Sequence, residues 1–314
     1  MMENENNIKE LYSSRIKNAI NDSFYAENVS WEGKIRTLRT YAEIIVRFIL
    51  NKPKGPLLLG REKEELMKIS NDNQVLMESF FTVKKYGNEN VHTEKLSNTT
   101  KKDFDEVLDA IYGMYAYLFI NYFEKFGISN ENRALGMFSL LPPIIRFKTF
   151  DYLWKKDKNN PILIDKLNLA ILKAFGIDKA NKWINENAAL LRQVPSTSEK
   201  AKYDLIQKVG NQVASKILKS KPQNMYEVCV FKVNRLSNPI ENYGPLYSTY
   251  EEASSFYKAK MNELEMTKKF SKEEIELKEI MDFCFEGRKE FSNDKDASLY
   301  LLSELGVISG GLDE

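Results

Sequence analysis

The stretch ESFFTVKKYGNENVH, residues 78–92, leads into a long aromatic segment that begins near Lys102. From there to residue 126 the apolar side chains recur at three- and four-residue steps, which predicts a helix packed along most of its length. Residues 98–100, Asn-Thr-Thr, are candidate caps for its start. His92 is the only histidine among the 314 residues, so a reaction that needs an imidazole near neutral pH must use it.

Three earlier segments, residues 8–25, 31–50 and 62–82, also carry helical patterns. Joined by short links to the helix at 102–126, they predict an up-and-down four-helix bundle at the N-terminus. Core packing explains most of the wide apolar stripe on the last helix. A dimer interface along its tyrosine edge is the alternative, and that edge consists of Tyr112, Tyr117 and Tyr122.

The helix at 31–50 places four charged residues on neighbouring turns: Arg36, Arg39, Glu43 and Arg47. Residues three or four apart meet on a helix surface, so this spacing predicts an ion-pair ladder in solvent. A partly buried site that uses the same arginines is the alternative interpretation.

Composition excludes several classes of protein. The 46 basic and 45 acidic side chains nearly cancel, so the net charge does not by itself draw the chain to nucleic acid or membrane. Only two cysteines are present, no uncharged run is long enough to span a bilayer, and the polar N-terminus is unlike a signal peptide. We therefore expect a cytoplasmic protein without a membrane segment. No phosphate loop, dinucleotide glycine pattern or zinc spacing occurs, so neither a cofactor nor a metal is expected.

The remainder of the chain predicts two further domains after the bundle at 1–128. Residues 129–222 read as a helical domain that ends in a lysine-rich connector, whose lysines we interpret as a solvated face. Residues 223–314 read as a small α+β module. In that module MYEVCVFKV, residues 225–233, alternates like a strand, and residues 245–250 return as its partner before further helices follow. The expected fold is mainly α, and the C-terminal β-hairpin with its helices is a candidate binding site for a protein partner.

Residues 30–126 resemble the HEPN superfamily. The resemblance rests on the arginine-rich second helix with TYAEIIVRFIL, the LLL turn, KKYGNENVH and the long final helix, and it is nearest to the branch with a Gly-Asn pair before a histidine. Members are helical bundles, commonly dimeric. Many are metal-independent ribonucleases with an Arg-Asn-x-x-x-His motif, found in toxin and phage-defence systems. The resemblance maps the asparagine to Asn88 and the histidine to His92, while Gly87 stands at the arginine position.

RNA cleavage without a metal needs a base for the 2′-hydroxyl, an acid for the leaving oxygen and cations for the phosphorane. His92 can serve as base or acid, because an imidazole has an ordinary pKa of about 6.5, and a homodimer would bring two copies into one cleft. Asn88 could orient the phosphate or the ring. The predicted RNA-binding cations are Lys84, Lys85, Arg39 and Arg36.

A non-catalytic interpretation stays open beside this one. In it, Gly87 takes a left-handed turn, and Asn88 and His92 cap helix ends in a tight corner. The chain would then be a helical scaffold that dimerises through the bundle and binds a protein or nucleic acid.

Overall fold

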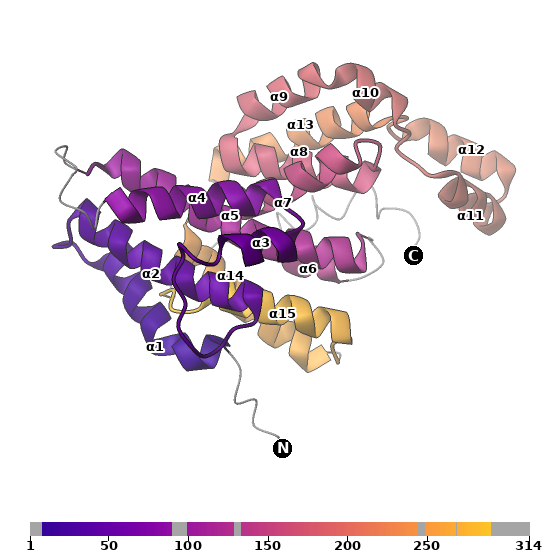
Figure 1. The fold of residues 1–314 in the computed structure, drawn as a ribbon. Coiled ribbons are helices and arrows are strands. Elements are labelled where there is room, and N and C mark those ends of the chain that lie inside the picture. Colours follow the sequence, from indigo (N-terminus) through magenta and orange to yellow (C-terminus); the bar gives the residue numbers. More distant parts are fainter. Residues whose placement is uncertain (1–7, 90–98, 129–132, 244–248, 268, 290–314) are drawn as a thin grey trace. The chain divides into compact units, whose positions relative to one another are not determined.

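The computed structural model describes residues 8–89, 99–128, 133–243, 249–267 and 269–289. Within these ranges the chain is mainly helical and forms no strand (Figure 1). It divides into two compact units. Unit 1 contains the described residues up to Gly127 and those from Ser254 onward, and unit 2 contains those from Ile128 to Ala253. None of the described helices is both long and apolar enough to cross a membrane.

Unit 1 is a helical bundle built from two separate parts of the sequence. Its elements are α1 (Ile8–Ile20), the π-helical turn η1 (Asn21–Tyr25), α2 (Trp31–Leu50), α3 (Lys63–Ser70), α4 (Gln74–Glu89), α5 (Lys101–Phe126), most of α14 (Tyr250–Thr267) and α15 (Lys272–Phe285). The helices predicted at 8–25, 31–50 and 102–126 are confirmed. The segment predicted at 62–82 is two helices, because Asn71 and Asp72 adopt positive φ and turn the chain between them.

The long helix α5 lies at the centre of unit 1 and packs against α2, α4 and α15. Thr100 and Asp103 form a reciprocal capping box at its start, which satisfies backbone groups that would otherwise lack a partner. Most of its residues from Phe104 to Phe123 are buried. At the other end Tyr122 donates to the backbone oxygen of Glu273, at 3.3 Å, so α15 covers that part of the candidate dimer edge.

A glycine brings α4 and α5 into close contact. A Cβ atom on Gly113 of α5 would overlap Ser79 Oγ of α4 and would lie 3.6 Å from the backbone oxygen of Val75. Ser79 is held there because it donates to that same oxygen at 2.7 Å. The two helices can approach this closely only because residue 113 has no side chain.

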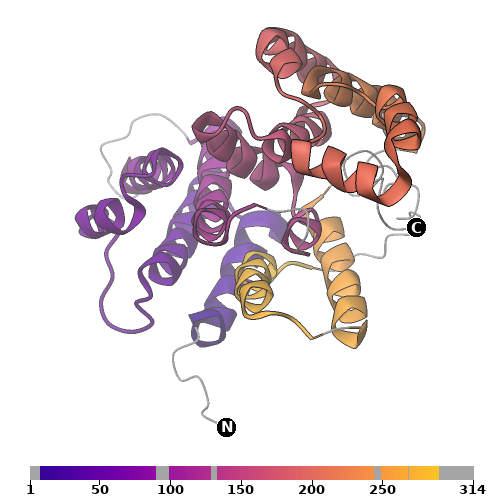
Figure 2. The ribbon, with the colours of Figure 1, turned by 90° about the vertical axis from the view of Figure 1, so that its right-hand side faces the viewer.

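An aromatic centre joins three helices of unit 1. The hydroxyls of Tyr41 on α2 and Tyr115 on α5 contact each other in the interior, and burial raises the pKa of Tyr41. Phe283 of α15 lies edge-on to the Tyr115 ring at 6.4 Å and stacks on Phe48 of α2 at 4.4 Å. Figure 2 shows the yellow α15 against the indigo N-terminal helices.

Unit 2 is built around α8 (Pro161–Phe175), which packs against α7 (Pro143–Lys156), α9 (Ile177–Glu186) and α13 (Met225–Tyr243). Its other helices are α6 (Ala134–Phe138), α10 (Ala188–Gln193), α11 (Glu199–Val209) and α12 (Asn211–Ser220). Prolines open α7 and α8, as expected from their tolerance in a first helical turn.

The predicted strand at 225–233 is wrong, because these residues begin α13. Their buried positions follow a helical period and not alternation: Met225, Val228, Cys229, Lys232, Val233 and Leu236. Asn224 caps the helix by accepting from Glu227 N at 3.0 Å. Residues 245–248 of the predicted partner strand lie outside the described residues, and Tyr250 begins α14, so the expected β-hairpin module is divided between two helical units.

The helical period of α13 includes a lysine because the interior holds its counter-ion. Lys232 is 1 % exposed, and its ammonium lies 2.7 Å from Asp165 of α8, which is equally buried. Removing either partner of such a pair leaves a buried charge alone, which is strongly destabilising. A strand interpretation puts the neighbours Lys232 and Val233 on opposite faces, whereas both are buried on α13.

Adding a methyl group at Gly113 should destabilise unit 1. We expect Gly113→Ala to lower the free energy of unfolding by about 1–3 kcal/mol in urea denaturation, because the new Cβ displaces Ser79 from a packed interface. The double variant Ser79→Ala/Gly113→Ala should recover most of the loss, since it removes the overlapping hydroxyl. Gly136→Ala is the control, because its Cβ would meet no atom within 4 Å. A Gly113→Ala protein as stable as wild type would contradict the close approach.

The two cysteines should report the opening of the two units separately. Cys284 in unit 1 and Cys229 in unit 2 are both fully buried, and burial raises the pKa of each thiol. In the single-cysteine variants Cys229→Ser and Cys284→Ser, we expect thiol labelling to be at least about a thousandfold slower in native than in unfolded protein. A cysteine placed at exposed Lys182 in a background without the other two should label rapidly. Fast labelling of either native thiol would disprove its burial.

Candidate functional site

The predicted site residues lie mainly on α2 and α4 of unit 1. Arg36 and Arg39 are on α2, and Lys84, Lys85 and the backbone of Asn88 are on α4. His92 and the side chain of Asn88 lie outside the part of the chain that the structure describes. The described part of the predicted site therefore ends with the last turn of α4, at Glu89, three residues before His92.

Arg39 lies directly over Gly87. A Cβ atom on Gly87 would be 2.5 Å from Arg39 Cδ and 3.2 Å from its Nε, so the arginine side chain occupies the space that any larger residue would take. Gly87 is helical and is not among the glycines with positive φ. The left-handed turn expected in the non-catalytic interpretation is therefore wrong at this residue, because α4 continues through Gly87 and Asn88.

The ion-pair ladder predicted along α2 does not form. Arg36 pairs with Glu32 at 2.5 Å, and Arg47 donates to the backbone oxygens of Lys52 at 3.1 Å and Gly55 at 2.8 Å. Within the described ranges, Arg39 makes no ion pair. Its guanidinium therefore lies beyond ion-pair distance of every described carboxylate, although its charge acts on Glu43. A guanidinium can bind a phosphate through two parallel hydrogen bonds.

Glu43 follows Arg39 by one helical turn and is half-buried. Burial raises the pKa of this carboxyl above its ordinary value, and the charges of Arg39 and Arg47 oppose that rise only in part. A carboxyl in this state holds its proton to a higher pH than an exposed one. The sequence placed Glu43 on the arginine face of α2, but its burial depends on the packing of α2 within unit 1.

The two lysines of α4 differ in environment. Lys84 is half-buried, and Lys85 is exposed with its ammonium 5.1 Å from the centre of the Tyr86 ring. Neither makes an ion pair with a described residue. Tyr86 is buried and donates to Glu106 of α5 at 2.5 Å. The last turn of α4 is thus held by α5 through Tyr86 and covered by α2 through Arg39. No local sequence pattern predicts that these three helices meet at Gly87.

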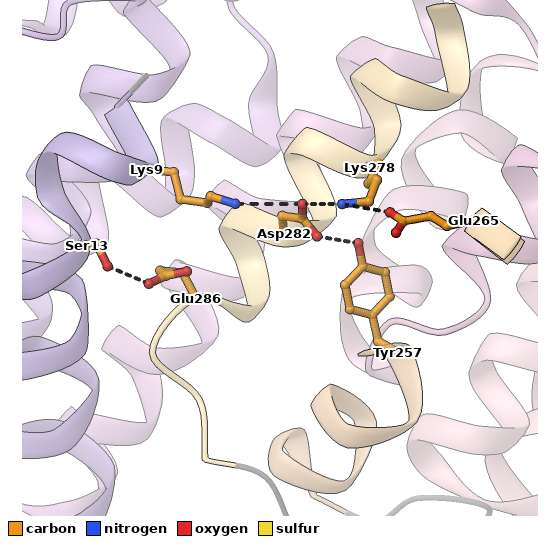
Figure 3. Close-up of polar contacts among 7 residues, drawn as sticks. All are labelled: Lys9, Ser13, Tyr257, Glu265, Lys278, Asp282 and Glu286. Atoms are coloured by element: carbon orange, nitrogen blue, oxygen red, sulfur yellow. Dashed lines mark hydrogen bonds and ion pairs between the residues drawn. The ribbon is translucent and has the colours of Figure 1, made fainter. Parts of the chain in front are cut away.

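A second polar cluster joins α1, α14 and α15 (Figure 3). Asp282 of α15 accepts from Tyr257 at 2.6 Å and from Lys278 at 2.8 Å, and Lys9 of α1 lies 3.7 Å away. Lys278 also lies 3.5 Å from Glu265, and Ser13 donates to Glu286 at 2.8 Å. Burial and the neighbouring Asp282 raise the pKa of Tyr257, which keeps its hydroxyl protonated. These groups pair with one another, so we interpret the cluster, which we call the clasp, as a link from α1 to α14 and α15.

Side chains suited to metal binding do not gather in the described part of the chain: no three of its histidine, cysteine, aspartate or glutamate residues form a group that could hold an ion. The two cysteines belong to different units and are buried.

Comparison of the chain with protein-family models, with curated proteins and with solved structures finds no match in any of the three.

Proposed function

We propose that this protein is a HEPN-like, metal-independent endoribonuclease. In this proposal α1, α2, α4 and α5 are the four helices of the bundle, and two copies of the chain form a cleft that contains His92 and Asn88 from each. Such an enzyme would suit a toxin or phage-defence system. The resemblance of residues 30–126 to the superfamily is one support, and the surroundings of Gly87 are the other.

The observation that carries the proposal is the position of Arg39 over Gly87. The nuclease motif has an arginine immediately before its asparagine, and this chain has a glycine there. A guanidinium from α2 lies beside that glycine, so the cation that the motif requires can come from a different helix. Arg39 would then stabilise the charge that develops on the phosphorane.

The remaining roles follow from the chemistry of the groups. His92 would remove the proton from the 2′-hydroxyl, and His92 of a second copy would donate one to the leaving oxygen. Asn88 would orient the phosphate by hydrogen bonding. Glu43, with its raised pKa one turn from Arg39, is a second titratable group on the same helix.

The non-catalytic scaffold is the second candidate, and the glycine at the arginine position favours it. A bundle that has lost the cation of its motif could keep its fold for dimerisation. Arg39 over Gly87 would then be a packing contact only.

Removing the imidazole or the α2 cation should slow RNA cleavage at least about a hundredfold. We expect purified wild-type protein to cleave single-stranded RNA in the presence of EDTA, and His92→Ala to lower the rate about 10²–10⁴-fold because it removes proton transfer. Arg39→Ala should lower the rate about 10²–10³-fold, by loss of transition-state stabilisation. The measurement is single-turnover cleavage of an end-labelled RNA.

Arg235→Ala is the matched control for that assay, because Arg235 is an exposed arginine on α13 of unit 2. It should cleave like wild type. Wild-type protein that is folded yet cleaves no RNA, or variants of His92 that cleave as well as wild type, would reject the nuclease and favour the scaffold.

A guanidinium supplied from α4 should replace the one lost from α2. We expect Gly87→Arg alone to perturb the protein, because its side chain meets Arg39, whereas Arg39→Ala/Gly87→Arg should recover at least about tenfold of the cleavage rate that Arg39→Ala loses. Arg39→Ala/Gly87→Ala fills the space without charge and should recover nothing. Equal rates for the two double variants would show that Arg39 acts only by packing.

A further inference from the structure

A pair of basic helices projects from the body of unit 2. The helices α11 and α12, with Lys221, form what we call the basic hairpin, residues 199–221. Figure 1 shows them side by side beyond α10. Their base is pinned where the chain leaves and returns: Met225 N donates to Val194 O at 2.9 Å, and Ser196 N donates to Gln223 O at 3.2 Å. The basic hairpin is therefore a defined projection, and not the connector that its sequence predicted.

The basic hairpin contributes little to a core. Only Leu205 and Ala214 are buried in α11 and α12, and these helices pack chiefly on each other. Three large apolar or aromatic side chains remain in solvent: Tyr203 at 62 %, Val213 at 50 % and Val209 at 37 % exposure. The basic hairpin therefore leaves most of its side chains accessible to a ligand.

Positive charge is concentrated on the basic hairpin. It contains the six lysines at 200, 202, 208, 216, 219 and 221 and only two acidic residues, Glu199 and Asp204, whereas the whole chain has a net charge of +1. Lys202 is paired with Glu199 at 2.7 Å. Lys200, Lys216 and Lys219 are exposed and make no ion pair with any described residue, and α12 has no acidic residue.

The exposed face of α11 combines a cation with an aromatic ring. Lys200, Tyr203 and Gln207 follow one another at three- and four-residue steps, so they form one strip on the side away from Leu205. Asp204 borders this strip, and Lys208 follows it. Lysines that flank an exposed aromatic ring provide for both parts of a nucleotide, the phosphate and the base.

We infer that the basic hairpin binds single-stranded RNA, with Lys200, Lys216 and Lys219 contacting phosphates and the Tyr203 ring stacking on a base. The choice of RNA over an acidic protein rests on the proposed function, and the exposed Tyr203 one helical turn from the unpaired Lys200 supports it independently. The basic hairpin would hold the substrate strand and take no part in proton transfer.

Binding and cleavage can be measured separately. The test uses full-length His92→Ala protein, so that the RNA stays intact, and fluorescence anisotropy with a labelled oligouridylate at several salt concentrations. In that background we expect Lys200→Gln/Lys216→Gln/Lys219→Gln to weaken binding at least about tenfold at 0.1 M salt and to flatten the dependence of log K on log salt by about 2. Tyr203→Ala should weaken binding about fivefold or more and leave the salt slope unchanged.

The control carries the same loss of charge elsewhere in unit 2. Lys155→Gln/Lys179→Gln/Lys182→Gln removes three exposed lysines outside the basic hairpin and should change affinity less than twofold. Circular dichroism melts check that each variant is folded. Because the lysines and the tyrosine are exposed, none of these changes removes core packing.

The inference would be overturned if the His92→Ala protein bound no RNA, or if the control and hairpin variants weakened binding equally. It would also be overturned if polyglutamate displaced the RNA at equal charge concentration, which would indicate an acidic protein partner. If RNA binding depends on the basic hairpin while wild-type protein cleaves nothing, the nuclease proposal fails and this inference stands.

Discussion

The burial of α5 is the constraint on which unit 1 depends. Most of this helix between Phe104 and Phe123 is apolar or aromatic and removed from solvent, so other helices must cover it. The N-terminal part of the chain supplies α2 and α4, and α15 arrives only after the whole of unit 2. Covering α5 thus brings α15 together with helices that lie before unit 2 in the sequence. The clasp in Figure 3 ties the returning α14 and α15 to α1.

The same packing determines the surroundings of the candidate site. At Gly113, α4 approaches α5 closely, and at its last turn Tyr86 bonds to Glu106. With α4 held in this way, Gly87 faces α2 and receives the side chain of Arg39. Gly87, which stands where the nuclease motif has an arginine, therefore leaves space for the arginine side chain of another helix. The proposed nuclease chemistry depends on Arg39 taking the role of that missing arginine.

The interior of unit 2 contains a buried ion pair. Lys232 and Asp165 form a buried pair between α13 and α8, which fixes how these helices face each other at the cost of removing two ions from water. The base of the basic hairpin is fixed by backbone hydrogen bonds at Val194 and Ser196. The basic hairpin is therefore a fixed projection of unit 2, although its sequence predicted a lysine-rich connector.

The sequence by itself determined that the chain is mainly helical and where most of its helices lie. Apolar periodicity and caps such as Thr100 and Thr249 act within a few residues, so local pattern is enough to find them. Only the tertiary structure decided that residues 225–233 are helical, that Arg39 lies over Gly87 and that the C-terminal helices return to unit 1. Each of these depends on a partner distant in sequence: Asp165 for Lys232, α4 for Arg39 and α5 for α15. A pattern within one segment contains no information about which residues of a distant segment will pack against it.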